Sequence, residues 1–307
     1  MQGLPNLGNT CYVNTTLQCL WACESFREYM KKNDVFFNIP NVFEVCDRSQ
    51  RIRSYKEMIL QMSRSISIID FREQMDIHEF VLFYLDFFFE TFKKIVRVQK
   101  PKMLITTNSK ISYNLDAHWF NSYSEVCDLI YGQYLIETKC QRCKHCVYNY
   151  ETSSVLSLAI PSLETSLNEC ITEYFSETEV ERVCDKCKHS TSMRETFMCK
   201  SPKVLICCLK RFQFSDNCFS KQVTPISIPQ ELIVSDFVKH NTLSPSYKLK
   251  SIAMHHGSLN DGHYTAVIVE NEKCVHINDF DVCDVSLSQI SDEIVSNNYM
   301  IFYERFN

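Results

Sequence analysis

The chain has 307 residues, of which 45% are hydrophobic and 22% are charged, a balance typical of globular proteins with a sizeable core. Its formal net charge of −5 argues against a nucleic-acid binder with a generally basic surface. The longest apolar run, residues 80–89, is interrupted by Asp86 and is too short to span a bilayer. We therefore expect neither a nucleic-acid partner nor a membrane partner.

The first third of the chain is predicted to be helical. Four apolar residues repeat along one helix face, namely Val13, Leu17, Leu20 and Trp21. Residues 75–95 form a second long helix without a breaker, which we expect to be largely buried.

Strand-like runs follow the helical part, at residues 203–214, 247–255, 263–270, 273–277 and 299–306. The run 203–214 is apolar on both faces, as expected of a central strand. A helical half followed by a sheet half predicts the α+β class.

The chain is rich in cysteine. There are 17 cysteines, an odd number, and residues 1–15 lack the pattern of a signal peptide. A reducing, intracellular environment, in the cytoplasm or the nucleus, is therefore expected instead of a disulfide framework.

Two C-x-x-C pairs, each in a polar turn, predict a metal site. Its ligands are Cys140, Cys143, Cys184 and Cys187. Four thiolates suit zinc, and four protein ligands leave no open position, so we expect one structural zinc ion and no catalytic metal. The neighbouring His145, Cys146 and His189 are alternative ligands. The competing interpretation is that packing alone holds the two turns.

Cys11 follows a loop rich in Gly, Asn and Pro. Gly8 permits a turn, and Asn9 and Thr10 are candidate N-caps, so Cys11 falls in the first turn of a helix. The unpaired N–H groups and the helix dipole at that position favour a thiolate. The other interpretation of this cysteine is a buried filler.

His263 is a candidate base, because it follows a glycine and opens a strand. If Glu270 and Asn271 are the central residues of the next turn, Asn278 stands directly opposite His263 in the hairpin. Opposed side chains of this kind lie within hydrogen-bond reach, and an Asn there orients the imidazole. A turn centred on Glu272 instead pairs His263 with Asp281.

Several segments together resemble the ubiquitin-specific proteases, a family of papain-like cysteine deubiquitinases. The residues that resemble the family's cysteine box are GLPNLGNTCYVNTTLQCL (3–20). Two further matches are EQMDIHEF (73–80) and SPKVLICCLKRF (201–212). The histidine box is matched by residues 247–269, by HIND (276–279) and by YMIFYER (299–305). The paired C-x-x-C motifs resemble the family's zinc-bearing fingers, and the matches follow the family's order along essentially the whole chain.

The resemblance implies a single catalytic domain over residues 1–307 with the shape of a right hand. A helical thumb occupies about 1–125, zinc-ribbon fingers and the first palm strands occupy about 126–215, and a β-sheet palm occupies about 216–307. The implied activity is hydrolysis of the (iso)peptide bond after the C-terminal Gly of ubiquitin, through a thioester on the enzyme. Ubiquitin and ubiquitinated proteins are then the partners.

The resemblance also implies roles for particular residues. Cys11 is the nucleophile, His263 the base, and Asn278 the residue that orients it. Asn6 and the Cys11 N–H hold the oxyanion, and Asp279 is a second acid, expected to face away from His263 or to act through water.

Residues outside the reacting group also match the family pattern or depart from it. The resemblance implies that Asp76 and Glu79 hold the basic tail of ubiquitin, although Glu79 also fits an ordinary solvated helix charge. Met75 and Ile277 replace a Gln and an aromatic residue of the family pattern. The competing functions are a catalytically dead ubiquitin-binding module and a protease for a ubiquitin-like modifier.

Overall fold

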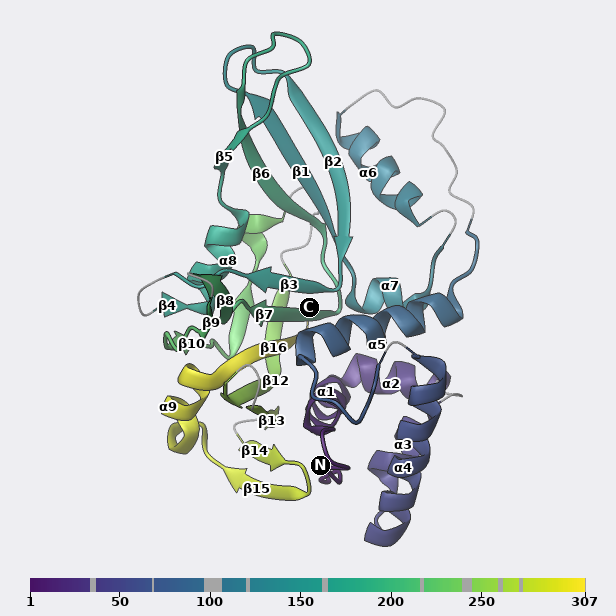
Figure 1. Cartoon of the computed structure of the whole chain (residues 1–307). Coiled ribbons are helices and arrows are strands. Elements are labelled where there is room, and N and C mark those ends of the chain that lie inside the picture. The colour runs from purple at the N-terminus through teal and green to yellow at the C-terminus, as the bar shows by residue number, and fades with distance from the viewer. Residues whose placement is uncertain are drawn as a thin grey trace.

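The computed structural model describes residues 1–33, 37–67, 69–96, 107–119, 122–161, 165–215, 218–238, 245–258, 262–270 and 273–306. Helices precede a large sheet in the chain, and an extended ribbon projects from their junction (Figure 1). Within the described residues, no helix is both long enough and apolar enough to cross a bilayer.

The first part of the chain is helical, as predicted. Its helices are α1 (Cys11–Ala22), α2 (Glu24–Asn33), α3 (Ile39–Glu44), α4 (Arg48–Ser65), α5 (Ile77–Phe92), α6 (Thr107–His118) and α7 (Glu125–Ile130). Every residue of α1 is buried, including the polar Asn14 and Gln18, whereas the sequence predicts a single apolar face. The difference arises because α1 packs against two strands of the large sheet, β12 (Ser246–Gly257) and β13 (Gly262–Glu270), and also against α5.

The helix predicted at residues 75–95 is α5, which is shorter at both ends. It begins where the Asp76 carboxylate accepts hydrogen bonds from the backbone N–H groups of His78 (2.7 Å) and Glu79 (3.3 Å). A side chain that pairs these otherwise unpaired donors is an N-cap. In Figure 1 the start of α5 lies near α1 and the large sheet.

The projecting ribbon is a four-stranded antiparallel sheet in the order β2-β1-β6-β5. Its strands are β1 (Gly132–Cys140), β2 (Cys146–Ser153), β5 (Thr178–Glu181) and β6 (Thr191–Lys200). The far end of this ribbon, at the top of Figure 1, carries the turns between β1 and β2 and between β5 and β6.

The large sheet has the order β15-β14-β13-β12-β16-β7-β3, and β11 also pairs with β12. Its strands are β3 (Val155–Leu158), β7 (Val204–Leu209), β11 (Glu231–Ile233), β12 (Ser246–Gly257), β13 (Gly262–Glu270), β14 (Lys273–Asn278), β15 (Asp281–Val285) and β16 (Asn298–Arg305). All six residues of β7 are buried, as expected of an inner strand. The strand predicted at 203–214 is divided, because a separate hairpin starts at Phe212.

Short elements complete the structure. They are β4 (Thr165–Ser166), α8 (Leu167–Phe175), β8 (Phe212–Ser215), β9 (Cys218–Lys221), β10 (Ile226–Ser227), η1 (Ser235–Phe237) and α9 (Leu287–Asn297). The guanidinium of Arg211, fully buried just before β8, donates to the backbone carbonyls of Gln222, Thr224, Val295 and Asn298. Arg211 thus ties the chain after β9 to the end of α9 and the start of β16.

Candidate active site and metal centre

Cys11 is the first residue of α1 and is 5% exposed. Thr10 occupies the N-cap position, but its side chain makes no capping hydrogen bond to the helix. Its hydroxyl accepts instead from the backbone N–H of Leu7, at 3.0 Å. The first-turn N–H groups of α1 therefore keep the positive end of the helix directed at the thiol.

His263 lies near the start of β13, one of the strands that pack against α1. The pKa of His263 is raised to about 9, and the largest cause is a hydrogen bond with the Cys11 side chain. The hydrogen bond to Asn278 and the charges of Cys11 and Asp279 also raise this pKa, whereas burial lowers it. Two residues far apart in sequence thus form a thiol–imidazole pair that favours the charged form of His263.

Two other histidines lie on β12 beside this pair, but they differ in charge state. Burial, with smaller effects from neighbouring cations, lowers the pKa of His255 to about 4. Burial also lowers the pKa of His256, whose Nε2 contacts the Thr265 hydroxyl at 3.2 Å. Both stay neutral at neutral pH, so His263 is the histidine suited to pair with a thiolate.

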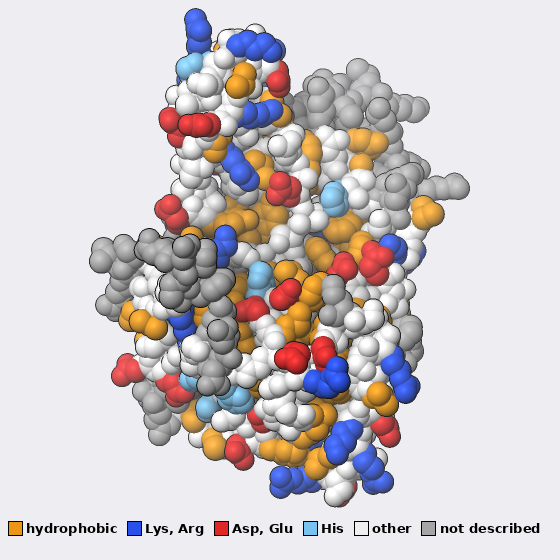
Figure 2. All heavy atoms as spheres, viewed as in Figure 1, with side chains coloured by type: hydrophobic (Ala, Val, Ile, Leu, Met, Phe, Trp, Pro, Cys, Tyr) orange, Lys and Arg blue, Asp and Glu red, His pale blue; other side chains and the backbone are white. Residues whose placement is uncertain are grey.

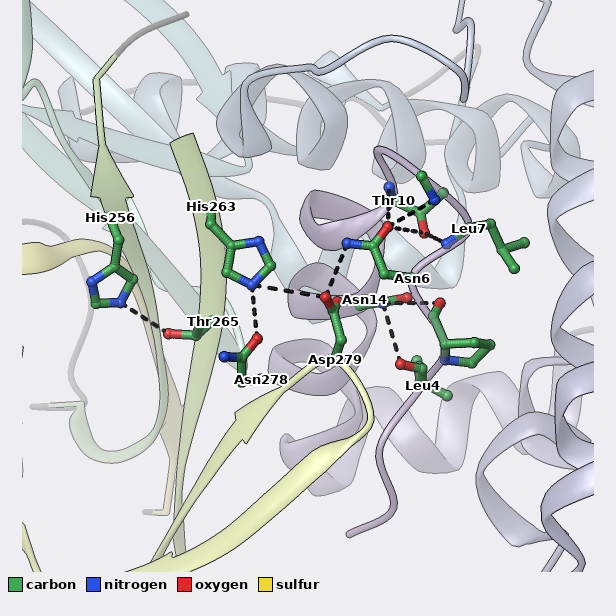
Figure 3. A network of polar contacts seen from close by, with 12 residues as sticks. Leu4, Asn6, Leu7, Thr10, Asn14, His256, His263, Thr265, Asn278 and Asp279 are labelled. Atoms are coloured by element: carbon green, nitrogen blue, oxygen red, sulfur yellow. Dashed lines mark hydrogen bonds and ion pairs between the residues drawn. The ribbon is translucent and has the colours of Figure 1, made fainter. Parts of the chain in front are cut away.

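Asn278 holds the imidazole, although the predicted hairpin register is wrong. Asn278 Oδ1 lies 2.8 Å from His263 Nε2 (Figure 3). The register pairs Glu270 with Lys273 and Ala266 with Ile277, so the next position aligns Asn278 with Thr265, two residues from His263. The contact is therefore diagonal, which the reach of His and Asn side chains permits. Because Nε2 is occupied, Nδ1 is left to face the thiol.

Asp279 also points at His263, contrary to the expectation that it faces away. One of its carboxylate oxygens, Oδ2, lies 3.7 Å from His263 Nε2 (Figure 3). Side chains alternate only along a strand, and Asp279 lies just after the end of β14 with a left-handed φ of 52°. The backbone turn therefore brings Asn278 and Asp279 to the same ring.

Asn6 is a further polar partner of Asp279. Its Nδ2 donates to Asp279 Oδ2 at 2.9 Å, and its Oδ1 accepts from the backbone N–H groups of Gly8 (3.0 Å) and Thr10 (3.2 Å). These bonds orient the Asn6 amide with its N–H₂ group toward the acid, and one N–H remains to donate elsewhere. The resulting geometry is that of an anchored hydrogen-bond donor in the loop before Cys11.

A cavity of about 90 Å³ adjoins the thiol and contains one of the two predicted substrate-binding acids. Asp76 and Met75 line it together with Cys11, whereas Glu79 does not. The Asp76 carboxylate also accepts from the hydroxyls of Tyr299 (2.7 Å) and Tyr264 (3.4 Å). In Figure 2, hydrophobic side chains gather in the hollow between the projecting ribbon and the helices, with acidic side chains near them.

The four cysteines of the C-x-x-C pairs meet at the far end of the ribbon, as predicted. Their sulfurs lie within 4.8 Å of one another, with 3.6 Å between Cys140 and Cys187 and 3.5 Å between Cys143 and Cys184. For metal–sulfur bonds of about 2.3 Å, tetrahedral geometry sets sulfurs about 3.8 Å apart. The cluster therefore has the size and donor set to hold a metal ion.

The two turns that carry these cysteines have the same backbone structure. In each, the residue after the second cysteine has a left-handed φ, of 59° at Lys144 and 57° at Lys188, and its N–H donates to the carbonyl of the first cysteine. Of the alternative ligands, Cys146 Sγ contacts Glu137 and His189 contacts Thr191. The cluster found among the described residues contains neither of these nor His145.

A model of the family described as "Ubiquitin carboxyl-terminal hydrolase" matches residues 2–303. The chain belongs to this family. Relatives include ubiquitin carboxyl-terminal hydrolase 21 of Homo sapiens, 25% identical over 98% of this chain and 61% of that protein. Another is probable ubiquitin carboxyl-terminal hydrolase 4 of Schizosaccharomyces pombe, 27% identical over 99% of this chain and 58% of that protein. The chain thus spans about three fifths of the length of these relatives.

Solved structures of the family confirm the fold. Ubp8 in the SAGA DUB module bound to monoubiquitin superposes with a TM-score of 0.80 at 19% identity, covering 100% of this chain and 69% of that one. The same module bound to ubiquitin aldehyde gives a TM-score of 0.78 at 21% identity, covering 100% and 70%. The α+β ubiquitin-specific protease fold expected from the sequence is therefore correct.

Proposed function

We propose that this chain is a cysteine-type deubiquitinase that cleaves the (iso)peptide bond after the C-terminal Gly of ubiquitin. The observation that carries the proposal is the juxtaposition of Cys11, at the start of α1, with His263 of β13, whose imidazole is held through Nε2 by Asn278 at 2.8 Å. A thiol at a helix start, a base and an orienting amide are the parts that thiol proteases need. Membership of the ubiquitin carboxyl-terminal hydrolase family supports the same activity.

The proposed reaction uses these groups in order. The Cys11 thiolate attacks the carbonyl carbon of the terminal Gly, and the charge that develops on oxygen is held by the Cys11 N–H and the free N–H of Asn6. His263, protonated at Nδ1, gives this proton to the leaving lysine amine. It then takes a proton from water as the water hydrolyses the thioester.

Ubiquitin is the proposed substrate because the curated relatives carry the name ubiquitin carboxyl-terminal hydrolase, and the Ubp8 structures contain ubiquitin or its aldehyde. In the proposed complex the C-terminal tail enters the cavity beside Cys11, where Asp76 faces it. Glu79 is exposed outside the cavity and acts, in this proposal, on basic residues farther along the tail.

We also propose that the metal held by Cys140, Cys143, Cys184 and Cys187 is a structural zinc ion. Four thiolates select zinc or an iron–sulfur cluster, and the closed cluster leaves no position for a substrate. The ion joins the two turns of the ribbon and would stabilise its tip.

The proposed location is intracellular, in the cytoplasm or the nucleus. It rests on the cysteine content, since 17 cysteines, an odd number, fit free thiols in a reducing environment better than a disulfide framework. Imaging of the tagged full-length protein in cells tests it.

The activity is tested by labelling the purified protein with electrophilic probes of ubiquitin and of ubiquitin-like modifiers side by side. We expect covalent capture of the ubiquitin probe at Cys11 and none by the Cys11→Ala variant. Labelling by a ubiquitin-like probe alone would assign the protein to that modifier. Binding of ubiquitin without labelling would identify a catalytically dead binding module.

A further inference from the structure

A buried chain of hydrogen bonds runs from α4 to the candidate active site. The hydroxyl of Tyr55, in the middle of α4, donates to Oδ1 of Asn14 in α1. Asn14 Nδ2 in turn donates to Asp279 Oδ1 at 2.7 Å. Tyr55 is 0% exposed and Asn14 is 2% exposed, so water does not compete for these bonds.

The Asn14 amide has a single satisfactory orientation. Three acceptors lie on its Nδ2 side: Asp279 Oδ1, the carbonyl of Pro5 at 3.2 Å and the carbonyl of Leu4 at 3.5 Å. A flipped amide would set its oxygen against all three. The Tyr55 hydroxyl therefore acts as the donor that satisfies Oδ1 on the opposite side.

Asp279 lies outside the strands, so contacts with other parts of the chain hold its backbone in place. It lies in the turn between β14 and β15 with a left-handed φ of 52°, a conformation uncommon for residues other than glycine. Its carbonyl accepts from the N–H of Leu4 at 2.9 Å. The next residue, Phe280, lies under the guanidinium of Arg48 of α4, 4.4 Å from the ring centroid.

The two oxygens of Asp279 have separate partners. Oδ1 is held by Asn14, which leaves Oδ2 to contact Asn6 (2.9 Å) and His263 (3.7 Å). Figure 3 shows Asn14 and Asn6 approaching this carboxylate from the N-terminal side, opposite Asn278 and His263. Rotation of the carboxylate would weaken the contacts of both Asn6 and His263.

We infer that Tyr55 and Asn14 are positioning residues for the reaction: they set the Asp279 carboxylate so that it orients the oxyanion donor Asn6 and stabilises the charged His263. The inference rests on the proposed function and extends it to α4, a helix that contributes no residue to the reacting group. Neither Tyr55 nor Asn14 touches the substrate in this arrangement.

The test compares Tyr55→Phe with a matched control, Tyr247→Phe. The Tyr247 hydroxyl is also 0% exposed and donates a single hydrogen bond, to the Pro202 carbonyl at 2.7 Å, but it lies at the far end of β12 from His255. Both variants lose one buried hydrogen bond, so stability alone does not distinguish them. We expect kcat on a ubiquitin substrate to fall about tenfold in Tyr55→Phe, since small misplacements of catalytic groups cost up to ~100-fold. KM should be unchanged, and Tyr247→Phe should keep full kcat.

The pH profile provides a readout that a merely structural role would not move. The charged and titratable groups that face His263 are Cys11 of α1, Asp279 of the turn, and His255 and His256 of β12. Of these groups, Asp279 is the one that the hydrogen-bond chain from Tyr55 through Asn14 reaches. The alkaline limb of kcat/KM should therefore move to lower pH, by about 0.5 unit, in Tyr55→Phe alone.

A second variant, Asn14→Asp, keeps the side-chain shape and the acceptor for Tyr55 but replaces the donor to Asp279 with an acid. Its activity loss should grow from pH 5 to pH 8, because two adjacent carboxyls share a proton at low pH and repel each other once that proton is lost. If Tyr55→Phe does not fold, this pH dependence carries the test.

Equal kcat and equal pH profiles in Tyr55→Phe and Tyr247→Phe, or a pH-independent effect of Asn14→Asp, would overturn the inference. Failure of the proposed function has a different signature, because the wild-type chain would then show no ubiquitin cleavage in the same assay. A double variant tests the same inference. If Tyr55 acts through Asp279, then Tyr55→Phe should cause no further loss of kcat in an Asp279→Ala background.

Discussion

The carboxylate of Asp279 lies 3.7 Å from His263 Nε2, the same ring nitrogen that contacts Asn278 Oδ1 at 2.8 Å. One imidazole atom therefore has a neutral partner at hydrogen-bond distance and a charged partner slightly farther away. The two can divide their tasks, since an amide orients the ring and a carboxylate stabilises its charge.

Replacing Cys11 with alanine should abolish isopeptide cleavage and leave ubiquitin binding nearly unchanged. Cys19→Ala is the matched control, because Cys19 is a second cysteine of α1 and burial raises the pKa of its thiol to about 12. Single-turnover assays and binding by calorimetry measure the two properties. Substantial residual turnover in Cys11→Ala would place the nucleophile elsewhere.

Asn278→Ala should lower kcat by about 10- to 1,000-fold, about 1.4–4 kcal/mol of barrier, with little change in probe binding. The expected cause is loss of the ring orientation set by the bond at His263 Nε2. Steady-state kinetics on a fluorogenic ubiquitin substrate measure it.

Asp279→Ala should also reduce kcat, because it removes the acceptor of Asn6 Nδ2 as well as the charge beside His263. The two variants differ in pH dependence: the alkaline limb of kcat/KM should move to lower pH more in Asp279→Ala than in Asn278→Ala. The reverse order would show that the carboxylate does not stabilise the imidazolium.

The alkaline limb of the wild-type kcat/KM should lie near pH 9. The pKa of His263 is raised to about 9, chiefly by its hydrogen bond with Cys11, so the imidazolium persists below that pH and is lost as the pH rises through it. In Cys11→Ala the main cause of the rise is absent, and the pKa of His263 should fall toward its ordinary value of about 6.5. NMR titration of the imidazole C–H signals checks this; an unchanged pKa in Cys11→Ala would contradict the pairing.

Metal analysis of protein purified without chelator should find one zinc ion per chain. Cys184→Ser should remove it and loosen the ribbon, since Cys184 lies 3.5 Å from Cys143 in the cluster. Cys146→Ser is the control, because Cys146 lies close to the ligand Cys143 in sequence but outside the cluster. Loss of zinc should first reduce ubiquitin binding, measured in the Cys11→Ala background. Zinc-free wild-type protein with normal binding would rule out this role.

Asp76 and Glu79 should separate in their effects. Asp76→Ala removes an N-cap and should lower the stability of the fold by about 0.5–2 kcal/mol, in addition to any loss of substrate binding. Glu79→Gln, at an exposed position, should leave the melting temperature unchanged and raise KM for ubiquitin a few-fold. An unchanged KM would show that Glu79 is an ordinary solvated charge.

Local chemistry in the sequence was sufficient to predict much of this protein. The C-x-x-C spacing places two thiolates on one turn, and a loop ending at Cys11 with apolar spacing after it indicates a helix start, so both features follow from neighbouring residues. The order of helices and strands likewise follows from hydrophobic periodicity. The position of the turn between β13 and β14 does not, because moving the turn by a single residue changes every cross-strand pair, and Asn278 accordingly aligns with Thr265 and not with His263.

The tertiary structure alone decided the arrangement around Asp279. Its left-handed backbone releases it from strand alternation, and this conformation is held by contacts with residues about 220 to 275 positions away, among them Leu4, Asn14 and, through Asn14, Tyr55. No local pattern marks such contacts, because Asn14 and Tyr55 read as ordinary polar residues of two helices. Only the packing of α1 between α4 and the sheet brings their polar atoms into one buried chain of hydrogen bonds. An unpaired polar group there would be costly, so the orientation of each side chain is determined by its neighbours.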